Sequence, residues 1–322
     1  MDILAVENLS ISFKTFDGIY QAIEKIDFSL KKGEILGIVG ETGCGKSVTA
    51  RAIMNLLPEN NTLISSGNIF YKNSDLLKLK NKVKKDIICN EMSMIFQDPM
   101  TYLNPVISIG KQLYDVVKVK NKTLSKHDIK KNVERLINLV KLPNPKNILQ
   151  SFPHELSGGM RQRILIAMAL AGKPKILIAD EPTTALDVTI QAQILNLIEE
   201  LRNELKLSVI LITHDLGVLA QFVDRVIVMY AGQIVEKALT YDLFNNPMHP
   251  YTNGLLNAIP NIYKNNKLQT INGSLPDLIK PPAGCRFYDR CGFKMNKCKN
   301  DLNDFMLSNE HFVRCFKFEN IS

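Results

Sequence analysis

The sequence predicts an α/β fold with an antiparallel β edge, an inserted helical region and a small irregular C-terminal extension. Three observations lead to it. Short apolar runs alternate with amphipathic stretches along the chain, as they do where strands pack against helices. Residues 6–13 and 23–30 alternate between apolar and polar side chains, which is typical of half-buried strands. Beyond residue 239 the composition shifts to turn-forming asparagine, proline and glycine.

The elements can be placed in order along the chain. A turn at Lys32-Gly33 separates the antiparallel edge from an apolar run with the composition of a buried strand. Apolar residues recur at helical spacing in two later stretches. The predicted strands are 6–13, 23–30, 35–39, 175–179 and 208–213, with a hairpin over 226–235 turning at Ala231-Gly232, and the predicted helices are 125–140 and 189–206. We expect residues 1–239 to form one domain, with a helical subdomain at about 98–170, and residues 240–322 to form the extension.

Composition limits the class of protein. The chain has 322 residues, of which 45% are hydrophobic and 22% charged, so it has material for a core and more than one typical domain. Its longest apolar stretch, 164–171, is far shorter than the ~20 residues of a membrane-spanning helix. The N-terminus lacks the basic and apolar regions of a secretory signal. We therefore expect a cytosolic protein that reaches a membrane only through an integral partner.

The net charge of +8 is concentrated in one region. Between Lys72 and Lys131 there are 13 lysines and 6 acidic residues. A solvated surface explains such a run, and a face near anionic lipid headgroups is the functional alternative. The lysines are not interleaved with aromatic residues or arginines, so no nucleic-acid partner is predicted.

A phosphate-binding motif follows the apolar run 35–39. Residues 40–47 match G-x-x-x-x-G-K-[ST], in which glycines let the backbone turn its N–H groups toward an anion at a helix N-terminus. Lys46 would contact the outer phosphates and Ser47 a Mg²⁺ ion. The predicted nucleotide-binding residues here are Gly40, Glu41, Thr42, Gly43, Cys44, Gly45, Lys46, Ser47 and Val48.

Two acidic residues follow the predicted strand 175–179. Phosphoryl transfer depends on positioning and on charge stabilisation. Asp180 is placed to hold Mg²⁺, and Glu181 to polarise the attacking water. A capped strand end is the structural alternative for this pair.

Together with these motifs, the segment Leu156-Ser157-Gly158-Gly159-Met160, followed by Arg161-Gln162-Arg163, resembles the ATP-binding-cassette (ABC) ATPases. The resemblance implies that Gln97 contacts Mg²⁺ and links the core to the helical insert, and that His214 contacts the γ-phosphate. It implies that residues 184–187, ending at Asp187, form a D-loop, and that Phe13 stacks on adenine, with Phe16 and Tyr20 as other candidates. It also implies that Ser157, Gly158 and Gly159 bind ATP held on a second cassette, so that one cassette per chain works as a dimer.

A finer resemblance covers almost the entire chain. Residues 96–105, 153–160, 246–252, 284–287 and 290–291 resemble the D-type ATPase subunit of oligopeptide and dipeptide importers, a subfamily shared with nickel importers. Tyr102 is a departure from the pattern. The resemblance implies a second, F-type cassette subunit, two membrane-spanning permease subunits and an extracytoplasmic binding protein. It places the chain at the cytoplasmic face of the membrane, with a dipeptide, an oligopeptide, nickel or a metallophore as cargo.

Four of the six cysteines fall within the turn-rich extension. Cys285, Cys291, Cys298 and Cys315 have 5, 6 and 16 residues between successive members. Disulfides are disfavoured in a cytosolic protein, and four thiolates can hold Zn²⁺ or a [4Fe–4S] cluster. The paired C-x-x-C motifs that are typical of zinc sites are absent from the sequence. Resemblance to importer subunits that carry a cluster favours iron and sulfur over zinc or free thiols. We expect the metal to order a region with little apolar content of its own.

Other classes of ABC protein fit the sequence less well. DNA-repair members insert long heptad-rich coiled coils, which this chain lacks. Ribosome-associated members acting in translation carry two cassettes, whereas this chain has one set of motifs. A non-hydrolysing subunit is disfavoured by the presence of Glu181 and His214.

Overall fold

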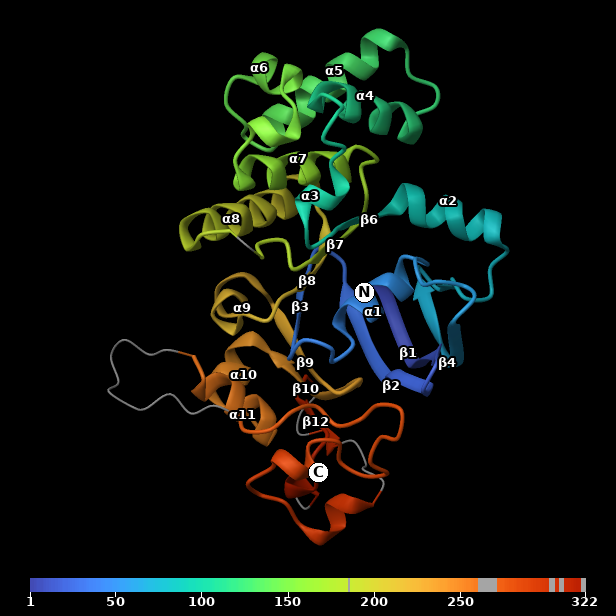
Figure 1. The fold of residues 1–322 in the computed structure, drawn as a ribbon, viewed down its shortest axis with the longest axis vertical. Coiled ribbons are helices and arrows are strands. Elements are labelled where there is room, and N and C mark those ends of the chain that lie inside the picture. Colours follow the sequence, from blue (N-terminus) through green and yellow to red (C-terminus); the bar gives the residue numbers. More distant parts are fainter. Residues whose placement is uncertain (185, 260–270, 301–304, 307–309, 320–322) are drawn as a thin grey trace. The chain divides into compact units, whose positions relative to one another are not determined.

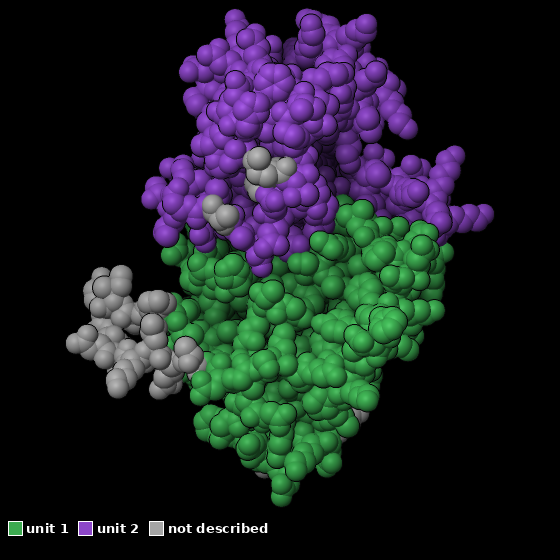
Figure 2. All heavy atoms as spheres, viewed as in Figure 1, with its two compact units in different colours: residues 1–78, 211–322 green, residues 79–210 purple. Residues whose placement is uncertain are grey.

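The computed structural model describes residues 1–184, 186–259, 271–300, 305–306 and 310–319. The chain divides into two compact units (Figure 2). Unit 1 consists of residues 1–78 and 211–322, and unit 2 of residues 79–210. No helix in the described part of the chain has the length and apolar character needed to cross a bilayer.

Unit 1 begins with an antiparallel sheet of order β2-β1-β4-β5 (Figure 1). Strands β1 (Asp2–Thr15) and β2 (Gly18–Lys31) pair as predicted, with Val6 opposite Phe28. Alternate side chains of both are buried, which explains why their periodicity was readable in the sequence. The sequence analysis did not identify β4 (Thr62–Tyr71) and β5 (Ser74–Asp75), which widen this edge.

A second set of strands in unit 1 has the order β11-β12-β10-β9-β3. Strand β3 (Ile35–Val39) is buried throughout and runs parallel to β9 (Arg225–Tyr230). The predicted hairpin to β10 (Gln233–Leu239) is confirmed, and its turn residues Ala231 and Gly232 both have positive φ. The helices of unit 1 are α1 (Lys46–Ile53), α9 (Leu216–Phe222), α10 (Thr240–Asn245) and α11 (Pro250–Asn257).

The described part of the C-terminal extension is largely irregular after α11, as predicted, but two short strands join it to the sheet. Its strand β12 (Phe312–Val313) pairs with β10, and β11 (Phe305–Met306) pairs with β12, so the extension continues the sheet. Short 3₁₀ turns occupy Tyr288–Arg290, Asn296–Lys299 and Phe316–Phe318. It also has an apolar cluster, formed by Cys298, Phe305, Val313, Phe316 and Phe318. The expectation of little apolar content was therefore wrong.

Unit 2 carries most of the helices. Strand β6 (Met92–Ile95) runs parallel to β7 (Ile176–Asp180). The division between the units falls within β8 (Ser208–Ile212), after Ile210. The helices predicted over 125–140 and 189–206 are confirmed as α5 (Lys126–Leu139) and α8 (Val188–Leu205). The others are α2 (Asn81–Glu91), α3 (Pro99–Tyr102), α4 (Ile109–Lys120), α6 (Pro145–Gln150) and α7 (Gly158–Leu170), with a 3₁₀ turn at Pro153–Glu155.

A buried carboxylate joins the extension to the sheet. Glu236 of β10 is fully buried, and its oxygens accept hydrogen bonds from the backbone N–H groups of Met248 and His249 at 2.8 and 2.9 Å. The His311 ring lies 2.8 Å from the same carboxylate. Burial lowers the pKa of His249 to about 4, so this ring stays neutral and accepts the Tyr251 N–H. One side chain thus fixes the start of α11 and the segment before β12.

Replacing Glu236 tests this arrangement. Glu236→Ala should lower the free energy of unfolding by about 3 kcal/mol, because it leaves the buried His249 N–H and the partly buried Met248 N–H without acceptors. Urea denaturation of the purified chain measures the change. Glu319→Ala, which removes an exposed ion pair with Lys297, is the matched control and should cost less than about 1 kcal/mol. Equal stability losses in the two variants would contradict this role of Glu236.

Candidate nucleotide-binding site

The phosphate loop connects β3 to α1 in unit 1. Gly40, Gly43 and Gly45 have φ values of 155°, 85° and 106°, which side-chain-bearing residues rarely adopt. A Cβ at Gly40 would lie 2.1 Å from the Met229 carbonyl oxygen, so no larger residue fits. The glycines therefore allow the tight backbone path that turns successive N–H groups toward one point at the start of α1.

Lys46 lies along this loop. Its side chain is buried, and its ammonium group donates hydrogen bonds to the carbonyl oxygens of Gly40 at 2.7 Å and Glu41 at 3.1 Å. The Thr49 hydroxyl donates to the Gly45 carbonyl at 3.0 Å and fixes the first turn of α1. Ser47, the predicted Mg²⁺ ligand, occupies that first turn. A cation and a row of backbone donors thus share a short segment of chain.

Two side chains from outside the motif also hold the loop. The Tyr251 hydroxyl accepts the Glu41 N–H at 2.9 Å, and the Arg290 guanidinium donates to both Glu41 carboxylate oxygens at 2.8 and 2.9 Å. Sequence reasoning missed both, because they lie more than 200 residues from Glu41 and belong to no local motif.

The remaining unit 1 candidates lie at strand ends. His214 is exposed and follows β8, next to Thr213, whose N–H donates to the Ile38 carbonyl of β3 at 3.2 Å. Phe13 and Tyr20 face each other across β1 and β2 and are half-buried, whereas Phe16 is fully exposed. The choice of adenine platform among Phe13, Phe16 and Tyr20, with Phe13 preferred, stays a prediction.

In unit 2, the structure brings Gln97 and Glu181 together. Strand β6 pairs with β7 so that Ile95 is opposite Ala179, and the residues beyond them meet. The Gln97 amide donates to a Glu181 carboxylate oxygen at 2.9 Å, and the Thr184 hydroxyl donates to the same oxygen at 2.9 Å. Asp180 is buried at the end of β7. The arrangement leaves an oriented carboxylate beside a buried one.

The Leu-Ser-Gly-Gly segment forms the N-terminus of α7. The Ser157 hydroxyl caps the helix by accepting the Met160 N–H at 3.3 Å. A Cβ at Gly159 would lie 2.6 Å from the Ile190 side chain, and one at Gly158 would lie 3.0 Å from Leu186. Asp187 is exposed and caps α8 by accepting the Ile190 N–H at 2.9 Å. The glycines therefore let the side chains of Leu186 and Ile190 pack directly on this helix start.

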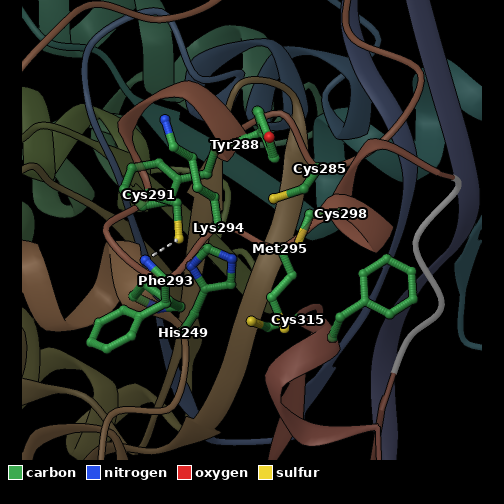
Figure 3. A pocket seen from close by; sticks show the side chains of 12 residues that line it. His249, Cys285, Tyr288, Cys291, Phe293, Lys294, Met295, Cys298 and Cys315 are labelled. Carbon is green, nitrogen blue, oxygen red and sulfur yellow. Dashed lines mark hydrogen bonds between the residues drawn. The ribbon is translucent and has the colours of Figure 1, made fainter.

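The four extension cysteines line one cavity in unit 1 together with His249 and Met295 (Figure 3). The Cys285 N–H donates to the Cys298 carbonyl, and Cys291 sulfur accepts the Phe293 N–H. Burial, and then the neighbouring Cys315, Cys298 and Cys291, raise the pKa of the Cys285 thiol to about 12. No three His, Cys, Asp or Glu side chains among the described residues are arranged so that they could hold a metal ion.

Two family models match the chain. The ABC transporter model matches residues 23–184, and the model of the oligopeptide/dipeptide transporter C-terminal region matches residues 235–298. The chain belongs to the ABC transporter family. Its ATPase class and its α/β cassette fold, both predicted from the motifs, are confirmed by this match and by the similarity to solved cassettes.

Curated relatives and solved structures that are similar to this ABC-family chain are also ATP-binding proteins of transporters or ATP-binding cassettes. It is 49% identical to the dipeptide transport ATP-binding protein DppD of Bacillus subtilis (strain 168), over 98% of this chain and 94% of the relative. It is also 49% identical to OppD, an oligopeptide transport ATP-binding protein of the same organism, over 97% of this chain and 88% of OppD. The structure of cbiO1 from Clostridium perfringens aligns with a TM-score of 0.66 at 28% identity, covering 76% of this chain and 91% of cbiO1. The ADP- and phosphate-bound dimer of the cassette MJ0796 aligns with a TM-score of 0.65 at 25% identity, covering 74% of this chain and 98% of the MJ0796 chain.

Proposed function

We propose that this ABC ATPase drives peptide import, with Glu181 as the residue that orients and polarises the attacking water. The observation that carries the catalytic assignment is the pair of hydrogen bonds from Gln97 and Thr184 to one Glu181 oxygen, at 2.9 Å each. Two donors on one oxygen hold the carboxylate in a single orientation. A carboxylate with a fixed orientation, next in sequence to Asp180, is suited to polarise a water molecule and accept its proton.

The other roles follow from what phosphoryl transfer requires. Phe13 stacks on adenine. Lys46 supplies a positive charge to the phosphates, and His214 and the N–H groups of residues 40–48 contact the phosphate oxygens. Ser47, Gln97 and Asp180 supply hydroxyl, amide and carboxylate oxygens, a donor set that suits Mg²⁺. When bound, Mg²⁺ reduces the charge that develops on the phosphate oxygens. None of these steps needs covalent chemistry from the protein.

The start of α7 supports a second role, at an ATP molecule held by another cassette. The N–H groups and the dipole at a helix N-terminus favour an anion, and Ser157 at the cap is exposed. We propose that Ser157, Gly158 and Gly159, with Asp187 of the D-loop, complete the site of a second, F-type cassette subunit. ATP then closes the pair and hydrolysis opens it.

Peptide import is supported by the names of the relatives and by the C-terminal region that they share. Those relatives are dipeptide and oligopeptide transport proteins, and the matched C-terminal region is named for the same transporters. We propose that residues 240–322 form a distinct extension of the cassette. The complete complex would contain two integral permease subunits and an extracytoplasmic binding protein, with this chain peripheral at the cytoplasmic face.

The four-cysteine cavity supports a structural [4Fe–4S] cluster, with Zn²⁺ as the alternative. Cys285, Cys291, Cys298 and Cys315 supply a four-thiol donor set that suits either metal centre. Burial raises the pKa of the Cys285 and Cys315 thiols, so binding a metal as thiolates would release protons. The sulfurs would also draw together on binding, since they are not arranged to hold a metal ion in the described structure. No hydrolytic step passes through this centre.

Glu181→Gln tests the catalytic assignment. The amide cannot accept the proton, so we expect hydrolysis by the assembled complex to fall about 100-fold or more while ATP binding persists. The variant should accumulate an ATP-bound closed dimer, measured as retained nucleotide. Glu204→Gln, an exposed change on α8, is the control and should hydrolyse normally. Near-normal turnover by Glu181→Gln would exclude Glu181 from this role.

The subunit assignment makes a prediction about pairing. This chain alone should hydrolyse ATP weakly, because a second cassette must supply the opposing Leu-Ser-Gly-Gly segment. Co-expression with its permeases and an F-type cassette, followed by ATPase assay, should give a large increase. Transport-coupled hydrolysis by a homodimer of this chain on the permeases would contradict the proposal.

Metal analysis of anaerobically purified complex tests the four-cysteine site. We expect a brown protein with about four iron and four sulfide per chain. Cys298→Ser should lose the colour, and Cys89→Ser, at an exposed cysteine of α2, should keep it. Stoichiometric zinc without iron would contradict the iron–sulfur cluster but support a metal site at the four cysteines. Absence of any metal would contradict both the cluster and the zinc site.

A further inference from the structure

The phosphate loop carries an acidic side chain in a segment that binds a polyanion. Glu41 is the second residue of the motif, and its carboxylate is partly exposed. Like charges a few ångström apart repel, and the repulsion grows where solvent is partly excluded. A free carboxylate at this position would therefore weaken the binding of a triphosphate.

Arg290 lies against this carboxylate in a forked arrangement. Its two terminal nitrogens donate to the two Glu41 oxygens at 2.8 and 2.9 Å, and only 7% of its side chain is exposed. A bidentate pair of this kind gives both charge compensation and a fixed geometry. The hydrogen bonds to Glu41 raise the pKa of Arg290 above its ordinary value, so its charge is permanent.

The arginine is itself held in place. Its Nε donates to the Asn272 carbonyl at 2.9 Å, and one terminal nitrogen donates to the Ile271 carbonyl at 3.2 Å. The guanidinium also lies 5.7 Å from the Tyr230 ring centre and 5.9 Å from that of Phe287. These contacts hold the Arg290 guanidinium beside the Glu41 carboxylate. Nucleotide binding therefore does not have to order the Arg290 side chain.

Tyr251 fixes the backbone of the same residue. Its hydroxyl accepts the Glu41 N–H at 2.9 Å, and burial raises the pKa of this phenol well above its ordinary value, so it stays protonated. The ring packs at an angle on Tyr230 and Phe287, with ring centres 4.7 and 5.4 Å away. Glu41 is thus held by its backbone from α11 and by its side chain from the segment 285–291.

We infer that Arg290 is a positioning residue for nucleotide binding, which cancels the Glu41 charge and, with Tyr251, holds the phosphate loop in its binding shape. The C-terminal extension is on this account part of the ATP site of its own subunit. The inference rests on the proposed function, because it concerns the affinity of the same loop for ATP.

The test measures the dissociation constant of Mg-ATP for the full-length chain by calorimetry. Arg290→Ala should weaken binding about tenfold, because the Glu41 carboxylate then faces the phosphates without compensation. Glu41→Ala combined with Arg290→Ala should restore binding to within about threefold of the parent. A purely structural role for Arg290 predicts no such rescue. The loss in Arg290→Ala should also shrink at high salt, since it is electrostatic.

Glu310→Ala is the matched control. It breaks the exposed ion pair between Glu310 and Lys31, which joins the extension to β2 away from the loop, and should leave ATP affinity unchanged. Equal affinity for Arg290→Ala and Glu310→Ala, or failure of the double variant to recover, would overturn the inference. Failure of the parent chain to bind ATP would instead overturn the proposed function, so the two failures are distinguishable.

Discussion

The path of the phosphate loop is the constraint on which unit 1 depends. Gly40 passes so close to the Met229 carbonyl that a methyl group could not fit. This approach fixes β9 beside the loop, and the Gly232 N–H of the next turn donates to the Cys44 carbonyl at 2.9 Å. The loop therefore takes its shape from the β9–β10 hairpin as well as from its own glycines. The extension builds on that hairpin through β12 and Glu236.

A loop that binds anions through backbone N–H groups needs those groups pre-arranged, because ordering them on binding would cost affinity. Tyr251 and Arg290 contribute to that arrangement from the extension. In unit 2, the same principle holds for Glu181, which has a positive φ of 48° and two side-chain donors on one oxygen. Strain at such a position persists only where its surroundings hold it.

The sequence predicted those parts whose signal is local. Strand β3 is a continuous apolar run, helix α5 has apolar residues at helical spacing, and the cassette motifs occupy contiguous segments. Contacts between distant segments left no such signal. Arg290 meets Glu41 across 249 residues, and two-residue strands such as β12 are too short to show periodicity. The apolar cluster of the extension was missed because its members are scattered between turns.

A structure of the assembled complex carrying Glu181→Gln, determined by electron cryo-microscopy with Mg-ATP, tests the proposed ATP site most directly. We expect ATP on the loop of residues 40–47, covered by the Leu-Ser-Gly-Gly segment of a different cassette subunit. We also expect Ser157 of this chain to face the ATP of that subunit. Nucleotide bound elsewhere, or a closed pair without ATP between the cassettes, would contradict the proposed site.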